Sequence, residues 1–195
     1  SLDKVEDAMT FYLKAKDVLE NSQEYKLLGL MSEGLGNLNR KQKLFDAALI
    51  NFRTSLQFYS KMPDSLGISF AYRNIGRVFL YKEQLDSAYY YFDKALHIAD
   101  IKKYPSVSSM LLEVGVVHRS AGDYLGAESY FLSFIEQERN ENNLYSGYLA
   151  LGNLYLYMNR LEDAKMYLTL CLKSSNLVIK RDACECLYDL EKELD

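Results

Sequence analysis

Residues 74–92 read NIGRVFLYKEQLDSAYYYF, and the spacing within this stretch decides the fold. Gly76 follows an apolar residue, Ala88 comes twelve residues after it, and Phe92 comes four residues after the alanine. A short polar break, YKEQ, lies between the glycine and the alanine. Glycine costs about 1 kcal/mol relative to alanine inside a helix, so its presence needs a packing reason. The stretch therefore predicts a helical hairpin in which the glycine allows two helices to approach closely.

The same spacing occurs four times along the chain. The glycines are Gly36, Gly76, Gly115 and Gly152; the alanines are Ala48, Ala88, Ala127 and Ala164; the bulky residues are Phe52, Phe92, Phe131 and Leu168. The interval between successive glycines varies, whereas the interval from glycine to alanine does not. Each hairpin is therefore a rigid unit, and repetition at such a period indicates a solenoid. We expect an all-α fold, an α-solenoid of antiparallel helical hairpins.

The repeat pattern also predicts boundaries for a single array. We expect a half repeat over 1–22, whole repeats over 23–62, 63–102, 103–140 and 141–176, and a half repeat over 177–195. The first half repeat is inferred from Ala8, Tyr12 and Ala15, and Tyr188 takes the glycine's place in the last. The ten predicted helices span 3–20, 23–40, 43–61, 64–81, 84–101, 104–121, 123–139, 142–158, 161–175 and 177–194. We expect this array to be part of a longer protein.

Composition restricts the functional classes. The 195 residues are 49% hydrophobic and 26% charged, which indicates a packed interior rather than a disordered chain. The net charge of −4 argues against direct nucleic-acid binding, which needs an excess of basic residues. No apolar run is long enough to predict a membrane span within this segment.

The sequence offers no constellation that predicts catalysis, a cofactor or a metal site. The chain has two histidines and three cysteines, without metal-ligand spacing. We expect the His118 ring to pack between helices and His97 to lie at the surface. Cys184 and Cys186 are two residues apart on a predicted helix, so their side chains point in different directions. We expect no enzymatic activity; an enzyme or enzyme subunit is the least favoured of three hypotheses.

The four-copy pattern resembles the tetratricopeptide repeat family. The match covers nearly the whole chain, with the four glycines on the small position of the family's first helix and the four alanines on that of its second. The resemblance implies a right-handed superhelix whose first helices line a concave groove for a protein or peptide. The units are three to six residues longer than the usual 34 and lack the family's proline, which implies a changed superhelical pitch.

The resemblance assigns a candidate partner-binding surface to one face of the first helices. Its residues are Asn37, Arg40, Phe70, Arg73, Asn74, Arg77, Arg119, Asn153 and Tyr157. Arginine can clamp a carboxylate, and asparagine can hold an extended backbone, so we expect an extended peptide bearing acidic groups. The same face of the last half repeat carries carboxylates, namely Asp182, Glu185, Asp189 and Glu193. The alternative is that these residues form only a solvated polar face.

Chaperone-binding members of the family use a clamp of lysines and asparagines. Asn37 and Asn74 match two of its positions, but Glu33 stands where a lysine would be, so we do not infer a chaperone partner. Long repeats rich in tyrosine and asparagine resemble arrays of Bacteroidetes signalling proteins. The sequence predicts a non-catalytic protein- or peptide-binding scaffold, the sensing or docking module of a larger bacterial protein, in the cytoplasm or the periplasm. The alternative is a homo-oligomerisation module that packs through the ends of the array, for instance as a homodimer.

Overall fold

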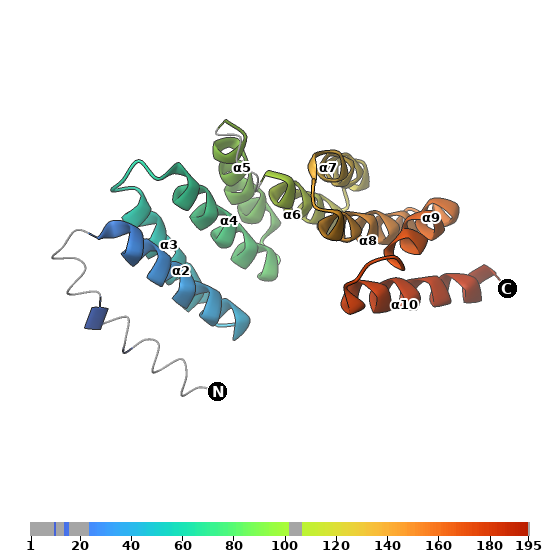
Figure 1. The fold of residues 1–195 in the computed structure, drawn as a ribbon, viewed down its shortest axis with the longest axis horizontal. Coiled ribbons are helices and arrows are strands. Elements are labelled where there is room, and N and C mark those ends of the chain that lie inside the picture. The colour runs from blue at the N-terminus through green and yellow to red at the C-terminus, as the bar shows by residue number, and fades with distance from the viewer. Residues whose placement is uncertain (1–9, 11–13, 16–23, 102–106, 195) are drawn as a thin grey trace. The chain divides into compact units, whose positions relative to one another are not determined.

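The computed structural model describes residues 10, 14–15, 24–101 and 107–194. Within these residues the chain forms nine long helices and no strand (Figure 1). The helix predicted over 3–20, with Ala8 and Tyr12, lies largely outside the described residues. The chain divides into two compact units, residues 1–105 and 106–195.

The described helices match the predicted spans to within a few residues. The first unit contains α2 (Tyr25–Lys41), α3 (Phe45–Tyr59), α4 (Ser65–Tyr81) and α5 (Leu85–Ile101). The second unit contains α6 (Val107–Ser120), α7 (Tyr124–Gln137), α8 (Glu141–Tyr157), α9 (Leu161–Cys171) and α10 (Leu177–Leu194). The largest difference is at the end of α9, which lies at Cys171 rather than at residue 175.

Consecutive helices pair as hairpins. The most extensive contacts within each unit join α2 to α3, α4 to α5, α6 to α7 and α8 to α9 (Figure 1). Neighbouring hairpins stack through contacts of α3 with α4, of α7 with α8, and of α9 with α10. The first helices of neighbouring hairpins also touch, α2 with α4, α6 with α8, and α8 with α10. Each unit therefore presents a continuous surface made of first helices.

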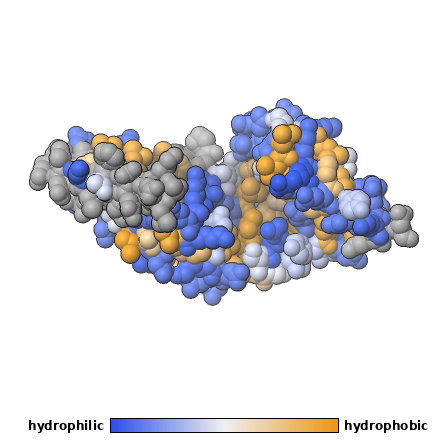
Figure 2. Space-filling model, turned by 90° about the horizontal axis from the view of Figure 1, so that it is seen from below, coloured by the Kyte–Doolittle hydropathy of each residue, from blue (hydrophilic) through white to orange (hydrophobic). Residues whose placement is uncertain are grey.

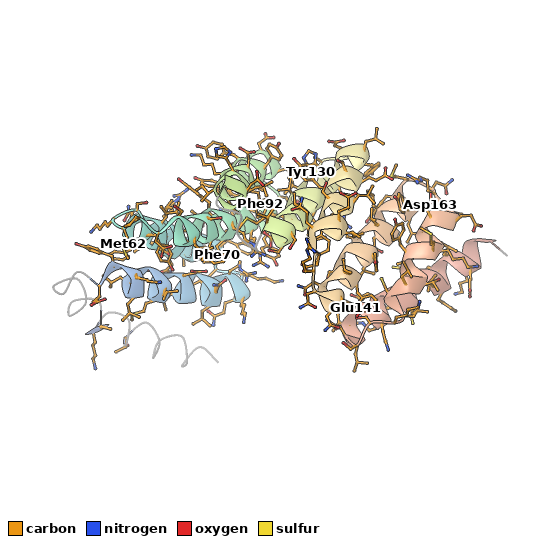
Figure 3. The ribbon with its side chains drawn as sticks, turned by 45° about the horizontal axis from the view of Figure 1, so that its top comes forward. Met62, Phe70, Phe92, Tyr130, Glu141 and Asp163 are labelled. Carbon is orange, nitrogen blue, oxygen red and sulfur yellow. The ribbon has the colours of Figure 1, made fainter. Side chains whose placement is uncertain are left out.

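The four glycines pack against the second helix of their own hairpins, as predicted. A Cβ atom added to Gly36 would lie 2.5 Å from the Phe52 ring, and one added to Gly152 would lie 2.7 Å from Leu168. Gly115 faces Phe131 in the same way. Phe92 extends from α5 toward Gly76 on α4 and is fully buried (Figure 3).

The matching alanines complete these contacts from the second helix. Ala48, Ala88, Ala127 and Ala164 are all fully buried. Two buried serines add hydrogen bonds across the hairpins: Ser55 Oγ donates to the Gly29 carbonyl at 2.8 Å, and Ser69 Oγ donates to the Ala95 carbonyl at 2.9 Å. Small residues thus allow the helices to lie close together, and the serine hydroxyls donate hydrogen bonds to backbone carbonyl groups of the facing helix.

Each hairpin turns through one residue with a left-handed backbone, a feature that was not predicted from the sequence. These residues are Lys43, Glu83, Gly122 and Asn159, with φ of 61°, 57°, 79° and 55°. Each lies seven residues after the landmark glycine. The residue that follows donates its N–H to a carbonyl in the last turn of the first helix, as Leu44 does to Asn39 at 2.9 Å. The fixed turn explains why the spacing from glycine to alanine is constant.

Candidate partner-binding surface

The first-helix surface of the N-terminal unit contains an arginine–aromatic cluster. The guanidinium carbon of Arg40, on α2, lies 5.7 Å from the centre of the Tyr81 ring, on α4. Arg40 Nη1 also donates to the Tyr81 hydroxyl at 3.5 Å. The Tyr81 ring also stacks on Phe45, with ring centres 6.0 Å apart and planes 6° from parallel. Tyr81 is therefore held by contacts from the neighbouring hairpin.

The C-terminal unit contains the same cluster at the equivalent repeat positions. The guanidinium of Arg119, on α6, lies 5.9 Å from the centre of the Tyr157 ring, on α8. Tyr124 stacks on Tyr157 at 6.3 Å, with 19° between the ring planes. In both units the arginine is four residues after the landmark glycine, and the tyrosine is five residues after the next one.

The two tyrosines remain accessible although they are held in position. Tyr81 is 56% exposed and Tyr157 is 67% exposed. A fixed and exposed aromatic ring beside an arginine is typical of the residues that dominate protein interfaces. The ring also loses little conformational entropy when a partner covers it, because its neighbours already restrict it.

Glu33 forms the centre of a second feature on this surface of the N-terminal unit. Asn74 Nδ2 donates to Glu33 Oε1 at 2.9 Å, and the hydroxyl of buried Tyr59 donates to Glu33 Oε2 at 3.3 Å. Burial raises the pKa of Tyr59 well above its usual range, and the nearby Glu33 carboxylate raises it further. Glu33 thus joins α2, α3 and α4, and one predicted surface residue, Asn74, is buried with its amide engaged by this carboxylate.

The other predicted residues of the N-terminal unit are half-buried. Asn37 Oδ1 accepts from Arg40 Nη2 at 3.4 Å, so this asparagine belongs to the arginine–aromatic cluster. Phe70, Arg73 and Arg77 lie on α4 and are also half-buried, with Phe70 labelled in Figure 3. Of the two predicted asparagines in this unit, Asn37 bonds within its own helix, whereas Asn74 joins α4 to α2.

A pocket lies in the C-terminal unit and includes all three residues predicted there. It has a volume of about 580 Å³. It is lined by Arg119, Asn153, Leu156, Tyr157, Asn159, Leu161, Cys186, Asp189 and Leu190. These residues come from α6, α8, α10 and the α8–α9 turn with the start of α9. The structure therefore brings together Arg119, Asn153 and Tyr157, which are far apart in sequence.

Cys186 provides a thiol within this pocket. Its Sγ atom lies 3.2 Å from Asn153 Oδ1, to which it donates. Burial raises the pKa of the Cys186 thiol, as do the carboxylates Asp189, Asp182 and Glu185. A protonated thiol is a weak nucleophile, so the environment does not activate it for chemistry. Cys184, two residues earlier, is exposed, which agrees with the predicted divergence of the two side chains.

One polar cluster in the C-terminal unit was not predicted from the sequence. Arg160 Nη1 donates to Glu128 Oε1 at 2.8 Å, and its Nε donates to Asp163 at 2.7 Å. Tyr155 donates to the same Glu128 oxygen at 2.7 Å and lies beneath the guanidinium, 4.2 Å from its ring centre. The cluster joins α7, α8 and α9, and both of its carboxylates accept hydrogen bonds from within it, so we assign it a role in packing.

The two histidines lie where they were predicted. His97 is exposed, and the ring of His118 packs against Tyr130 of the neighbouring helix at 4.9 Å. His118 Nδ1 lies 2.7 Å from Asp123 Oδ2. Among the residues that the structure describes, no group of three or more potential ligands is arranged to hold a metal ion. No described helix has the length and apolar character required to cross a membrane.

In the view of Figure 2, the described residues show no single continuous apolar face. Hydrophobic residues form separate patches among hydrophilic ones. The view therefore does not by itself mark one interface, and the location of the candidate surface depends on the clusters described above.

Comparison with known proteins agrees with the repeat pattern. Two models described as tetratricopeptide repeat match residues 27–101 and 145–176. The ycf37 protein of Guillardia theta is 25% identical over 126 residues, which cover 65% of this chain and 67% of that protein. The crystal structure of BtubC (BKLC) from P. vanneervenii superposes with a TM-score of 0.78 at 14% identity, and covers 98% of this chain and 90% of that one. At this identity the structural likeness shows the fold alone.

Proposed function

We propose that the first-helix surface of this chain binds an extended segment of a partner protein. The premise is that the chain belongs to the tetratricopeptide repeat family. The family membership makes the chain a protein-interaction scaffold with an all-α solenoid fold. The observation that supports the location is the recurrence of one cluster in both units. Arg40 with Tyr81, and Arg119 with Tyr157, present an exposed ring at the same repeat position.

The chemistry of the surface favours a ligand with carboxylate groups. Arg40, Arg73, Arg77 and Arg119 all belong to the first helices, and arginine binds carboxylates with two parallel hydrogen bonds. The tyrosines add a large apolar area and a hydroxyl group, a combination that suits interfaces. We therefore propose Asn37, Arg40, Phe70, Arg73, Asn74, Arg77, Arg119, Asn153 and Tyr157 as the partner-binding residues. In this assignment Asn74 acts by fixing Glu33 rather than by direct contact.

A peptide-selection experiment tests the location. The intact chain is used to select binders from a displayed library of random 12-residue peptides, and the affinity of each binder is measured by fluorescence anisotropy. The combined variant Tyr81→Ala and Tyr157→Ala should weaken binding at least tenfold. Tyr89 and Tyr90 are also exposed tyrosines, and both lie on the second helix α5, outside the first-helix surface. Tyr89→Ala with Tyr90→Ala is the matched control and should bind normally; the reverse pattern would place the interface elsewhere.

A homo-oligomerisation module is the alternative function, and one observation favours it. Leu177 and Val178, in the first turn of α10, are 78% and 54% exposed. A second copy that packed on this end would bury them. Sedimentation velocity over a hundredfold range of concentration would reveal such association. Replacing Leu177 and Val178 with glutamate would abolish it if this end is the contact.

The wider role that we propose is a sensing or docking module within a larger bacterial signalling or regulatory protein. The support is the resemblance of the long, tyrosine-rich repeats to signalling arrays. The adjoining gene sequence provides a direct check, because a regulator, kinase or DNA-binding domain in the same open reading frame would agree with this role. A parent protein with only repeats would contradict it.

A further inference from the structure

The pocket of the C-terminal unit contains charges of both signs, contributed by two different helices. Arg119 supplies a guanidinium from α6, and Asp189 supplies a carboxylate from α10. Among the described residues, neither forms an ion pair that would neutralise it within the chain. Asp189 is exposed and Arg119 is half-buried.

The remainder of the lining is suited to aliphatic and peptide groups. Leu156, Leu161 and Leu190 are apolar, and Leu190 is almost fully buried beneath the pocket. Asn153 belongs to the lining and accepts from Cys186, which leaves its amide nitrogen as a donor. Lysine and arginine side chains bind such sites with their stems along apolar surface and their charged ends at a carboxylate.

The volume limits how much of a ligand the pocket can take. A space of about 580 Å³ lies within the range of sites that enclose a small molecule or a few side chains. In an extended peptide, side chains two residues apart lie on the same side, about 7 Å from each other. A short segment can therefore present two side chains to this pocket at once.

We propose that the pocket binds an extended peptide segment in which an acidic and a basic side chain lie two residues apart. The acidic group pairs with Arg119, beside the Tyr157 ring. The basic group pairs with Asp189, with its stem over the leucines. This inference rests on the proposed function, because it names the ligand class at one part of the same surface. It goes further by predicting that acidic groups alone are not sufficient for binding at this unit.

Synthetic peptides test the charge requirement. Four fluorescent nonapeptides, acetylated and amidated so that their ends are neutral, share one sequence apart from two central positions two residues apart. These positions carry Glu and Lys, Glu and Glu, Lys and Lys, or Gln and Gln. Fluorescence anisotropy with the intact chain measures each affinity. The Glu and Lys peptide should bind at least tenfold more tightly than the other three.

A charge-reversal variant tests the role of Asp189. Asp189→Lys should transfer the preference from the Glu and Lys peptide to the Glu and Glu peptide, because the pocket then carries two cations. The matched control is Glu136→Lys, which makes the same charge change at an exposed position on α7. This control should retain the original preference. Circular dichroism and thermal unfolding verify that both variants are folded.

The thiol in the pocket gives an independent readout. Cys171 is buried and Cys184 is exposed. Once Cys184 is replaced by serine, Cys186 is the one cysteine left for an alkylating reagent to label, and it lies in the pocket. The Glu and Lys peptide should slow iodoacetamide labelling of Cys186, measured by mass spectrometry, at least threefold. The Gln and Gln peptide should leave the labelling rate unchanged.

The outcomes separate this inference from the proposed function. The Glu and Glu peptide could bind as tightly as the Glu and Lys peptide or more tightly, in a manner that depends on Arg119 but not on Asp189. This result would overturn the proposal of a mixed-charge ligand, whereas the proposal of an acidic partner would stand. Failure of all four peptides to bind or to protect Cys186 would overturn the pocket assignment. The library selection with the tyrosine variants would then decide the proposed function separately.

Discussion

Gly36 on α2 lies directly against the ring of Phe52 on α3, and a Cβ atom at this glycine would be 2.5 Å from the ring carbon Cε1. At the equivalent contact between Gly76 and Phe92 the corresponding distance is 3.0 Å. Gly36→Ala should therefore destabilise the protein by about 1–3 kcal/mol through overpacking. Gly76→Ala should change stability by less than about 1 kcal/mol, because the gain in helix propensity offsets a smaller clash.

Gly34 gives a matched control for this comparison. It is exposed on the same helix as Gly36, and a Cβ atom there would meet nothing within 4 Å. Gly34→Ala should stabilise the protein by up to about 1 kcal/mol, because alanine is the better helix former. Urea unfolding of the three variants measures the order. Equal stability of the variants at Gly34 and Gly36 would contradict the packing account.

The fully buried alanines Ala88 and Ala127 should also resist enlargement. Replacing either with leucine should destabilise the protein by about 1–3 kcal/mol, because the second helix has no space for the larger side chain. Ala121, which is exposed in the turn between α6 and α7, gives a control in which leucine should be tolerated. Thermal unfolding provides the comparison. Unchanged melting of both core variants would mean that the repeat register is wrong.

The left-handed turn residues predict stabilising substitutions. Lys43 and Glu83 are exposed and have positive φ, a conformation that costs residues with a side chain roughly 1–2 kcal/mol. Lys43→Gly and Glu83→Gly should each stabilise the folded protein by about 0.5–1 kcal/mol, because the relief of this strain exceeds the freedom that glycine gains in the unfolded chain. Gly122→Ala should have the opposite effect at the third turn. Chemical unfolding at constant m-value tests all three, and a loss of stability in both glycine variants would refute this explanation.

The α7 N-terminus should contribute to stability in a pH-dependent manner. The Asp123 carboxylate accepts from the Gly126 N–H at 3.0 Å and lies 2.7 Å from His118 Nδ1, and the pKa of this carboxyl is lowered by these two interactions. A lowered pKa in the folded state means that the contribution is present above the unfolded pKa, near 4, and is lost as the pH falls through the folded value.

Asp123→Asn isolates this effect, because asparagine can still accept from the helix N–H groups but cannot carry the charge. The wild-type protein should have the higher melting temperature at pH 7, and the difference should shrink as the pH is lowered from about 4 to about 2. A difference that stays constant over this range would show that the charge of Asp123 does not contribute.

The arginine pair on α4 supplies a functional prediction. Arg73 and Arg77 are one helical turn apart and half-buried on the proposed surface. Arg73→Ala with Arg77→Ala should weaken partner binding by about 2 kcal/mol or more, because both side chains are proposed to anchor the ligand. Lys94→Gln on α5 is a control outside this surface. Isothermal titration with a selected peptide measures the loss, and full affinity in the double variant would place the interface elsewhere.

Much of the fold follows from the sequence alone. The fixed spacing from Gly36 to Ala48 and Phe52, repeated four times, predicts the hairpins, and the helix bounds follow from the polar breaks between them. This was sufficient because a close helix–helix contact needs small residues at defined positions, and such a requirement leaves a periodic trace in the chain. The right-handed superhelix and the single continuous array remain predictions.

Only the tertiary structure decided how the surface residues are used. The sequence placed Asn74 on the binding face, but its amide is engaged by Glu33, because Tyr59 from another helix fixes that carboxylate. Likewise, Arg119 and Asp189 line one pocket since α6 and α10 both pack against α8. Backbone periodicity is local and can be read along the chain, whereas hydrogen-bond partners and pocket walls depend on contacts between distant residues.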